Sequence, residues 1–317
     1  MREEVFAFKV FAEDEGKRFD RFFQPRDLPL SRSRIKQLIE SGQFRLNGRT
    51  AKPGVRLKLG DEISGTIPPP KALEVEAENI PLDVLGEDRD IIVVNKPAGM
   101  VVHPAPGNNS GTLVNALLFH CGDLSGINGI LRPGIVHRLD KLTSGVIVAA
   151  KNDLAHESLA RQFKNRTVEK RYLAIVYGHF PESEGRVDTS LGRHPRNRMM
   201  MSVHTRVPRE ALTRWRVLEG LRHFTLLEIS PRTGRTHQIR VHLASIGHPV
   251  LGDPVYCRRK HLKQIPDREV RTRAEKFKRQ ALHASDLRFF HPQSGEPVGF
   301  HAPLPDDMEE VVDFLRE

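Results

Sequence analysis

Cysteine is scarce in this sequence, since only Cys121 and Cys257 occur among 317 residues. Two thiols are too few for a disulfide framework or for a zinc site built from cysteines. Long hydrophobic runs are also missing, because no apolar stretch approaches the roughly 20 residues that span a bilayer. The opening segment MREEVFAFKV lacks the apolar core and cleavage site of a secretory signal. We therefore expect a cytoplasmic protein without redox, structural-metal or membrane roles.

Positive charge is in excess, with a formal net charge of +10. Such an excess attracts polyanions through counterion release, so nucleic acid is the expected partner. Many basic proteins bind no nucleic acid, however, and charge alone does not decide the question. A length of 317 residues with 38% hydrophobic residues is enough for one large and one small unit, each with its own core.

The segment from about residue 17 to residue 66 has the pattern of a small domain that begins with a helix. Ser31 or Ser33 can cap this helix, and Gly42 lies where a left-handed residue ends it. The apolar side of the helix carries Ile35, Leu38 and Ile39.

A small antiparallel element is predicted after the helix, from residues 44–46, the turn pair Asn47-Gly48 and the alternating run at 55–59. The exposed side of this unit is strongly basic, and we expect it to contact RNA rather than to be only a solvated surface. Its cations are Arg32, Arg34, Lys36, Arg45, Arg49 and Lys52.

Three consecutive prolines at 68–70 favour an extended, semi-rigid spacer, so we divide the chain into residues 1–72 and 73–317. Strand-like and helix-like segments alternate in the second part without a regular repeat, which predicts an α+β domain. The expected strands are 91–94, 145–150, 172–177 and 224–229; the expected helices are 112–120, 154–164 with Asp153 as its cap, and 236–246 before Gly247.

The segment 257–280 is unusual because it carries ten lysines and arginines against three acidic residues. One interpretation is a flexible, solvated insertion. We favour the other, a strand or loop extension that contacts a phosphate backbone.

The most informative stretch is residues 132–146, RPGIVHRLDKLTSGV. It is polar, contains glycines, and leads directly into a buried strand, which is typical of a rigidly placed active-site loop. Asp140 is its only carboxylate. An aspartate among basic residues is often only a salt-bridge partner or a turn cap, so this position alone does not establish catalysis.

The core His-Arg-Leu-Asp at 137–140, with its Lys-x-Thr-Ser-Gly continuation, resembles the signature of the RluA family of pseudouridine synthases. The resemblance covers about residues 80 to 310, and residues 1–72 resemble an αL (S-four-like) RNA-binding domain. One departure is Leu142, where the family commonly has an aspartate. The other matching stretches are KPAGMVVHP at 96–104, KRYLA at 170–174, TGRTHQIRVH at 233–242, GDPVY at 252–256 and QALHA at 280–284.

The resemblance implies a mixed, mainly antiparallel sheet and the isomerisation of uridine to pseudouridine in large-subunit (23S) ribosomal RNA or a pre-50S particle. This reaction breaks a carbon–nitrogen bond, rotates the uracil and joins its carbon 5 to the ribose, without net redox change. No cofactor or metal is therefore expected, and we expect a monomer. The alternatives are the same chemistry on tRNA or another rRNA site, and a non-catalytic RNA-binding ribosome-assembly factor.

The resemblance also implies roles for single residues. Asp140 is expected to be the catalytic carboxylate, as nucleophile or as base, and Arg235 to be the arginine that keeps it charged. Tyr172 is expected to be the platform for the flipped base and a proton acceptor near its carbon 5. Arg138 is expected to fill the vacated position in the RNA, with His137 beside it as a further RNA contact.

The sequence contains 15 histidines, so a metal site needs consideration. His237 and His242 are five residues apart on a predicted helix, whereas four would place both on one face, and no carboxylate set accompanies them. We therefore expect these histidines to serve in packing or capping.

Overall fold

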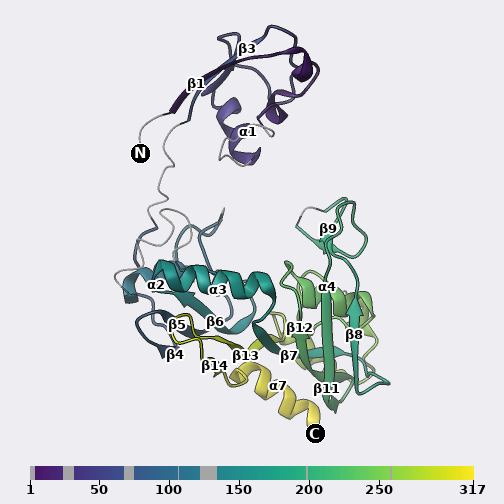
Figure 1. Ribbon diagram of the computed structural model, residues 1–317. Coiled ribbons are helices and arrows are strands. Elements are labelled where there is room, and N and C mark those ends of the chain that lie inside the picture. The colour runs from purple at the N-terminus through teal and green to yellow at the C-terminus, as the bar shows by residue number, and fades with distance from the viewer. Residues whose placement is uncertain are drawn as a thin grey trace. The chain divides into compact units, whose positions relative to one another are not determined.

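The computed structural model describes residues 4–23, 32–67, 75–105, 107–121, 134–197, 199–257 and 259–317. The chain forms two compact units, residues 1–73 and 74–317 (Figure 1). Both units combine helices with mainly antiparallel strands, so the expected α+β class is confirmed. The proline-rich segment 68–70 lies outside the described residues.

The N-terminal unit is a three-stranded antiparallel sheet with a helix. The strand order is β1-β3-β2, so the central strand is the last of the three in sequence. Four phenylalanines, all nearly fully buried, and the predicted apolar side of α1 form its core. The elements are β1 (Glu4–Lys9), the 3-10 turns η1 (Ala12–Asp14) and η2 (Phe19–Arg21), α1 (Arg32–Glu40), β2 (Phe44–Leu46) and β3 (Glu62–Ile67).

The predicted helix is confirmed as α1, and Gly42 has the expected left-handed φ of 74°. Of its two possible caps, Ser31 and the side chain of Ser33 lie outside the described residues. The predicted strand at 55–59 is wrong, because β2 pairs with β3 instead. The alternation there buries only Leu57, while Val55 and Leu59 remain exposed, so the run has no second apolar residue to hold it on the core.

The larger unit is built on a nine-stranded sheet with the order β4-β5-β6-β13-β7-β12-β11-β8, in which β14 pairs with β13. Among the described strand pairs of this sheet, only β6 with β13 is parallel. The strands are β4 (Val84–Glu87), β5 (Ile91–Lys96), β6 (Ser144–Ala150), β7 (Glu169–Tyr177), β8 (Glu184–Asp188), β11 (Leu212–Leu221), β12 (Phe224–Pro231), β13 (Leu282–Phe290) and β14 (Pro297–His301). The hairpin β9 (Gly192–Arg193) and β10 (Met201–Ser202) lies outside this sheet.

Helices cover the sheet in two groups, as Figure 1 shows: α2 and α3 beside β5 and β6, and α4 beside β11 and β12. The four predicted strands and three predicted helices of this unit are all found within a few residues of their expected bounds. The cap of α3 differs, because Asn152 and not Asp153 accepts a hydrogen bond from the Ala155 amide. The helices are α2 (Leu113–Cys121), α3 (Asp153–Asn165), α4 (Gln238–Ser245), α5 (Arg259–Lys263), α6 (Arg268–Lys276) and α7 (Asp306–Arg316).

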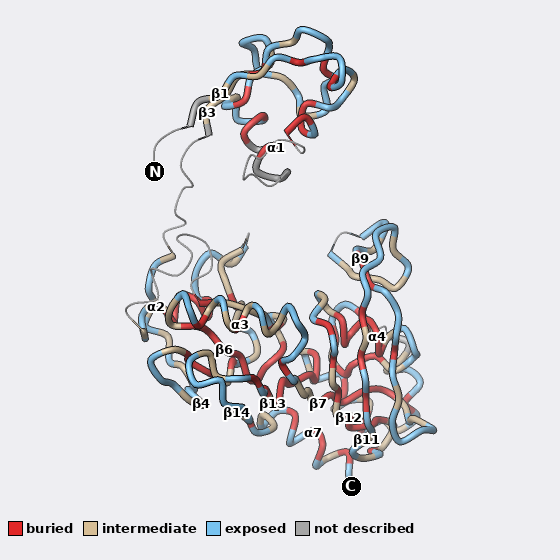
Figure 2. The backbone as a smooth tube through the Cα atoms, in the orientation of Figure 1, coloured by how far each residue is buried: buried red, intermediate tan, exposed pale blue. Residues whose placement is uncertain are grey.

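Buried residues concentrate on the central strands, and every residue of β6 is buried (Figure 2). The parallel pairing sets Gly145 of β6 beside Ala284 of β13, and Ala284 in turn lies opposite Tyr172 of β7. A Cβ atom at Gly145 would lie 2.1 Å from the Ala284 carbonyl oxygen, and the backbone φ of Gly145 is 114°. A glycine is therefore required where the loop that contains Asp140 enters the sheet.

The basic segment 257–280 is helical, so the predicted strand or loop extension is wrong. Asp267 caps α6 by accepting hydrogen bonds from the amides of Glu269 and Val270. The helix buries Val270 and Ala274, which are four residues apart and share one face. Two cations of the segment pair with acids on α7. Arg279 lies 2.6 Å from Asp307, and Arg273 lies 3.0 Å from Glu310. These pairs stabilise the fold and leave the two arginines less available to a phosphate backbone.

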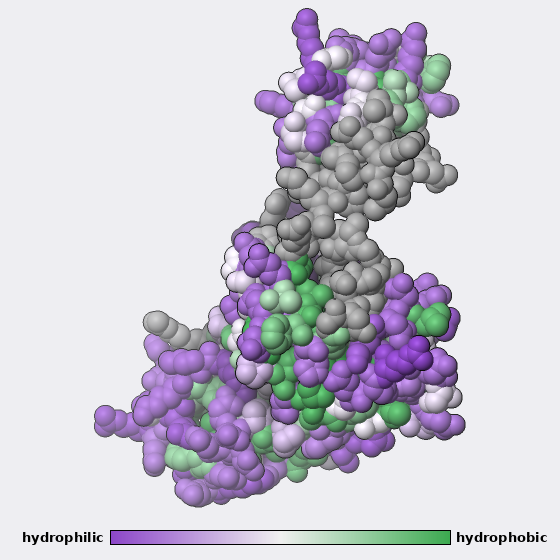
Figure 3. Space-filling view, turned by 90° about the vertical axis from the view of Figure 1, so that its left-hand side faces the viewer, coloured by the Kyte–Doolittle hydropathy of each residue, from purple (hydrophilic) through white to green (hydrophobic). Residues whose placement is uncertain are grey.

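Hydrophilic side chains cover much of the face shown in Figure 3. None of the described helices is long and apolar enough to cross a membrane.

The close approach at Gly145 gives a first prediction. We expect Gly145→Ala to lower the free energy of unfolding by about 3 kcal/mol or more, because it adds backbone strain and a contact with a backbone oxygen that cannot move aside. Urea unfolding followed by circular dichroism measures this change. Gly220→Ala in β11 is the control, because nothing lies within 4 Å of its added methyl group. Equal stability of the two variants would contradict this account of β6 and β13.

Candidate active site

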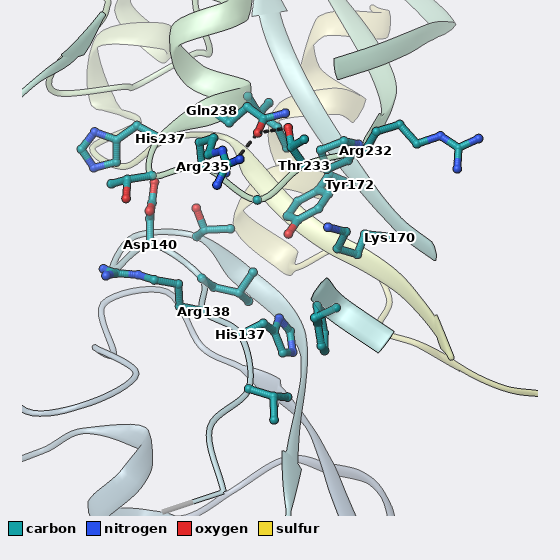
Figure 4. Close-up of a pocket in the computed structure, with 18 of the residues that line it drawn as sticks. His137, Arg138, Asp140, Lys170, Tyr172, Arg232, Thr233, Arg235, His237 and Gln238 are labelled. Carbon is teal, nitrogen blue, oxygen red and sulfur yellow. Dashed lines mark hydrogen bonds between the residues drawn. The ribbon is translucent and has the colours of Figure 1, made fainter. Parts of the chain in front are cut away.

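One pocket of about 630 Å³ brings together the loop before β6, strand β7 and the turn between β12 and α4 (Figure 4). A volume of this order is typical of small-ligand sites. The predicted residues His137, Arg138, Asp140, Tyr172 and Arg235 all line it. The structure thus brings together side chains that are up to 98 positions apart, from 137 to 235 in the sequence.

Backbone contacts hold the loop that carries Asp140. Gly134 accepts a hydrogen bond from the Ala150 amide at 2.9 Å, which fastens the start of the loop to the end of β6. The backbone carbonyl of Asp140 accepts a hydrogen bond from the Thr143 amide at 3.0 Å, which closes a tight turn. Because these bonds use main-chain atoms, the turn does not depend on the side chain of Leu142, the one departure from the family pattern.

Arg240 in α4 is the residue that pairs with Asp140. Its Nη1 donates to Asp140 Oδ2 at 2.8 Å, while Nε and Nη2 donate to the two carboxylate oxygens of Asp253 at 2.6 and 2.9 Å. Asp253 also accepts hydrogen bonds from the amides of Val255 and Tyr256. Two-point binding by a fully buried carboxylate fixes the guanidinium plane, so Arg240 presents its third donor to Asp140 in one orientation.

The expectation that Arg235 is the partner of Asp140 is wrong. Arg235 lies in the turn before α4, and its Nε donates to the backbone oxygen of Glu210 at 3.2 Å. The side-chain carbonyl of Gln238 accepts a hydrogen bond from the Arg235 amide, and α4 begins only at that glutamine. Arg240 is therefore buried inside the helix, while Arg235 lies in the turn before it and lines the pocket (Figure 4).

The surroundings of Asp140 pair one of its carboxylate oxygens with a cation and leave the other available. Burial alone would lower the pKa of Arg240, but the hydrogen bonds and charges of Asp253 and then Asp140 outweigh it and raise the pKa. The guanidinium is therefore permanently charged. Among the described residues, nothing donates a hydrogen bond to Asp140 Oδ1, and the side chain is 19% exposed. This oxygen is open to a substrate in the pocket.

Tyr172 of β7 places its ring in the pocket beside the Asp140 loop (Figure 4). Burial, and then the charge of Asp140, raise the pKa of its phenol above the ordinary value. A neutral phenol of raised pKa is a poor proton acceptor near neutral pH. The raised pKa therefore argues against the expected acceptor role, while the place of the ring in the pocket agrees with the expected platform role.

His137 and Arg138 differ in what they offer to a ligand. The Val148 amide donates to His137 Nε2 at 3.1 Å, and the ring stacks on Phe163 with centroids 4.5 Å apart. Burial, and then the charge of Lys170, lower the pKa of His137 to about 3, so the ring is neutral and holds the loop on β6. His137 therefore offers no charge to RNA, and its expected role as an RNA contact stays a prediction. Arg138 is exposed at the pocket, and its expected contact with RNA stays a prediction.

The basic residues expected in the N-terminal unit are described in part. Lys36, Arg45, Arg49 and Lys52 are exposed, and Lys36 lies 3.5 Å from Glu40. The side chains of Arg32 and Arg34 lie outside the described part of the chain.

The histidines considered as metal ligands are hydrogen-bonded to the protein. His237 Nδ1 lies 2.9 Å from the Tyr256 hydroxyl, and the residue is the N-cap of α4. His242 contacts the Thr213 hydroxyl through Nδ1 and the Thr189 carbonyl through Nε2, both at 2.9 Å. Hydrogen bonds within the protein account for both rings, and the ring of His237 makes no capping hydrogen bond to α4.

One described group has the spacing of metal ligands, namely Asp88, Asp90 and His291. It lies outside the pocket lining. His291 Nε2 is 2.9 Å from Asp88, and Asn152 donates to Asp90 at 2.7 Å, so these oxygens already have partners in loops around β5.

Sequence reasoning missed two residues that build the site, Arg240 and Lys96. Lys96 is fully buried, and its Nζ donates to the carbonyls of Pro97 and Met100 at 2.8 and 2.9 Å. A longer contact of 3.4 Å reaches the carbonyl of Lys141, next to Asp140. Burial lowers the pKa of Lys96 to about 7, which the charge of Asp140 partly offsets. Both residues occur in motifs that resemble the family, Lys96 at 96–104 and Arg240 at 233–242, but the sequence does not show their contacts, which depend on distant segments.

The two arginines of this region give a second prediction. We expect Arg240→Met to lower the free energy of unfolding by about 3–5 kcal/mol, because it leaves the buried carboxylate of Asp253 without its partner. Arg235→Met should cost about 1 kcal/mol or less, because it loses one hydrogen bond to a backbone oxygen at the pocket edge. Urea unfolding of both variants tests the difference, and equal losses would argue against the buried pair.

The comparisons with known proteins agree with this geometry. Residues 90–245 match the family model described as RNA pseudouridylate synthase, and residues 28–63 match the S4 domain. A Bacillus subtilis protein named as the uncharacterized RNA pseudouridine synthase YlyB is 48% identical over 305 residues, which cover 96% of each chain. A Zymomonas mobilis protein named ribosomal large subunit pseudouridine synthase D is also 48% identical, over 95% of this chain and 94% of that protein.

A solved structure, human RNA pseudouridylate synthase domain containing 1, has a TM-score of 0.57 and 29% identity to this chain. It covers 78% of this chain and 98% of its own. Sequence, domain order and fold therefore lead to one conclusion: the chain belongs to the RluA family of RNA pseudouridine synthases and carries an S4 domain in its N-terminal unit.

Proposed function

We propose that this pseudouridine synthase acts on uridines of large-subunit (23S) ribosomal RNA, free or in a pre-50S particle, with Asp140 as its catalytic carboxylate. The substrate is suggested by relatives named ribosomal large subunit pseudouridine synthase D, at 41–48% identity over most of the chain. The protein is expected to need no cofactor or metal, because the isomerisation exchanges bonds within one nucleotide. We also expect it to act as a monomer.

One observation carries the role of Asp140. Its Oδ2 is held at 2.8 Å by Arg240, and its Oδ1 has no donor among the described residues. A carboxylate that has one oxygen paired with a guanidinium and the other oxygen open to the pocket can act at a ribose carbon or on a ribose proton. Tyr172 lines the same pocket, so a base that entered would lie between a ring and a reactive oxygen.

The bond changes of the reaction are balanced within the uridine. The electron pair of the C1′–N1 bond leaves with the uracil, which becomes an anion, and Asp140 acts at the ribose as nucleophile or base. After the uracil rotates, carbon 5 bonds to C1′. Carbon 5 then loses its proton and N1 gains one. The target must first leave its stack, and Arg138 is suited to fill the gap because a guanidinium plane can stack on bases.

The test of the substrate is a map of pseudouridines in rRNA and tRNA from cells with and without this protein. We expect positions in large-subunit rRNA to revert to uridine when the gene is deleted and to be restored by the wild-type gene. Loss of pseudouridine confined to tRNA would reject the proposed substrate.

The third prediction concerns the carboxylate. We expect Asp140→Asn to fold and to bind RNA but to lose on the order of 10⁴-fold or more in rate, about 5 kcal/mol of barrier stabilisation. Tritium release from RNA labelled at carbon 5 of uridine measures the rate. Retention of a tenth of wild-type activity would exclude the proposed role of Asp140.

The fourth prediction concerns the N-terminal unit. Replacing Lys36, Arg45 and Arg49 by alanine should weaken RNA binding and reduce the log–log salt slope by up to about two to three, since each phosphate contact contributes roughly 0.7–0.9. Turnover of a saturating short stem-loop should be unchanged. Binding curves at several salt concentrations measure the slope. A variant with the wild-type slope would show that these cations do not contact phosphate.

A further inference from the structure

Lys170 is a half-buried cation of the pocket that the mechanism above does not use. It lies on β7 two residues before Tyr172, so both side chains point to the same face of the strand. Both line the pocket, and Figure 4 shows the Lys170 amino group beside the Tyr172 ring. Arg171, between them, points the other way and lies 3.5 Å from Glu228.

The other cations that line the pocket are either paired or exposed. Arg240 is held by two aspartates, Arg166 by Glu210 at 2.9 Å, and Arg235 by a backbone oxygen. Three more, Arg138, Lys164 and Arg232, are exposed. Among the described residues, no carboxylate or carbonyl lies within hydrogen-bond distance of the Lys170 ammonium, which makes it the half-buried pocket cation without an internal partner.

This arrangement is costly unless a ligand supplies an acceptor. Burial lowers the pKa of Lys170, which means that its charged form is less well solvated here than in water. The ammonium faces the pocket, where water can reach it while the site is open. A base that fills the pocket displaces that water and leaves the charge unsatisfied, unless the base accepts a hydrogen bond itself.

We propose that the Lys170 ammonium donates a hydrogen bond to a carbonyl oxygen of the flipped uracil and stabilises the negative charge that develops on the ring as the C1′–N1 bond breaks. This inference rests on the proposed function of the pocket. The electron pair of that bond spreads onto the carbonyl oxygens of the leaving uracil, and Lys170 keeps its proton throughout. A fixed donor aimed at developing charge is among the strongest contributions to catalysis.

The position of Lys170 favours a base carbonyl over a phosphate. A phosphodiester keeps much of its hydration and suits the exposed cations Arg138, Lys164 and Arg232 at the rim. Lys170 instead lies inward, next to the ring that we expect to support the base. Uracil offers two carbonyl oxygens there, and an ammonium can only donate.

The fifth prediction compares full-length Lys170→Met, Lys170→Arg and wild type under single-turnover conditions with saturating enzyme. Methionine keeps the apolar stem and removes the charge. We expect its saturated rate to fall by about 10²-fold, the loss typical of one donor to a developing anion, with a much smaller change in RNA affinity. Arginine should restore part of the rate. Lys276→Met on α6, which is exposed and outside the pocket, controls for the loss of one positive charge.

A second measurement uses target uridines with sulfur in place of one carbonyl oxygen, at position 2 or at position 4. Sulfur accepts hydrogen bonds more weakly than oxygen. The wild type should therefore lose rate with one of the two substrates, and Lys170→Met should lose that particular sensitivity. This arm also applies to the wild type alone, should the methionine variant fail to fold.

The proposal is overturned if Lys170→Met loses affinity at an unchanged saturated rate, which would make Lys170 a phosphate contact. It is also overturned if rate and affinity both stay at wild-type levels, or if the variant retains the sulfur sensitivity. The proposed function fails separately, because it requires the wild type to form pseudouridine and Asp140→Asn not to, whatever the result at Lys170.

Discussion

The active site depends on the placement of one guanidinium between two carboxylates. Asp253 is fully buried and takes two of the Arg240 donors, while Asp140 is 19% exposed and takes one. These three side chains together therefore carry one negative charge more than positive charge, in a pocket whose other lining residues include several cations. Because burying an unpaired carboxylate is so unfavourable, the Asp253 contact fixes Arg240, and through it the carboxylate of Asp140.

The central sheet brings this ion pair and Tyr172 to one pocket. Strand β13 separates β6 from β7, yet its residue opposite both strands is a small one, Ala284, and Gly145 has no side chain at all. These two small residues let the Asp140 loop approach Tyr172 closely. The parallel pairing matters as well, because it sets the start of β6, where the Asp140 loop ends, beside Ala284, and Ala284 lies opposite Tyr172.

Local patterns predicted most of the elements, since a buried run such as β5 or an amphipathic helix such as α3 is recorded in consecutive residues. The place of Asp140 in the pocket was also predictable, because the resembling motif contains the only acid of its loop. The partner of Asp140 was not, since Arg235 and Arg240 occur in one motif and only the start of α4 decides which of them faces inward. The prediction for the basic segment 257–280 failed for a related reason: acidic partners of Arg273 and Arg279 are on α7, 37 and 28 residues further along the chain.

The net charge of +10 is therefore a poor guide to where RNA binds, because the fold divides the cations into two populations. Those with carboxylate partners, such as Arg240 and Arg279, stabilise the structure and contribute little to counterion release. Exposed cations without a carboxylate partner, such as Arg45 and Arg138, remain available to phosphates. Lys170 belongs to neither population, since it is partly withdrawn from water and yet unpaired. A substrate that accepts a hydrogen bond from Lys170 would supply the partner that the protein does not.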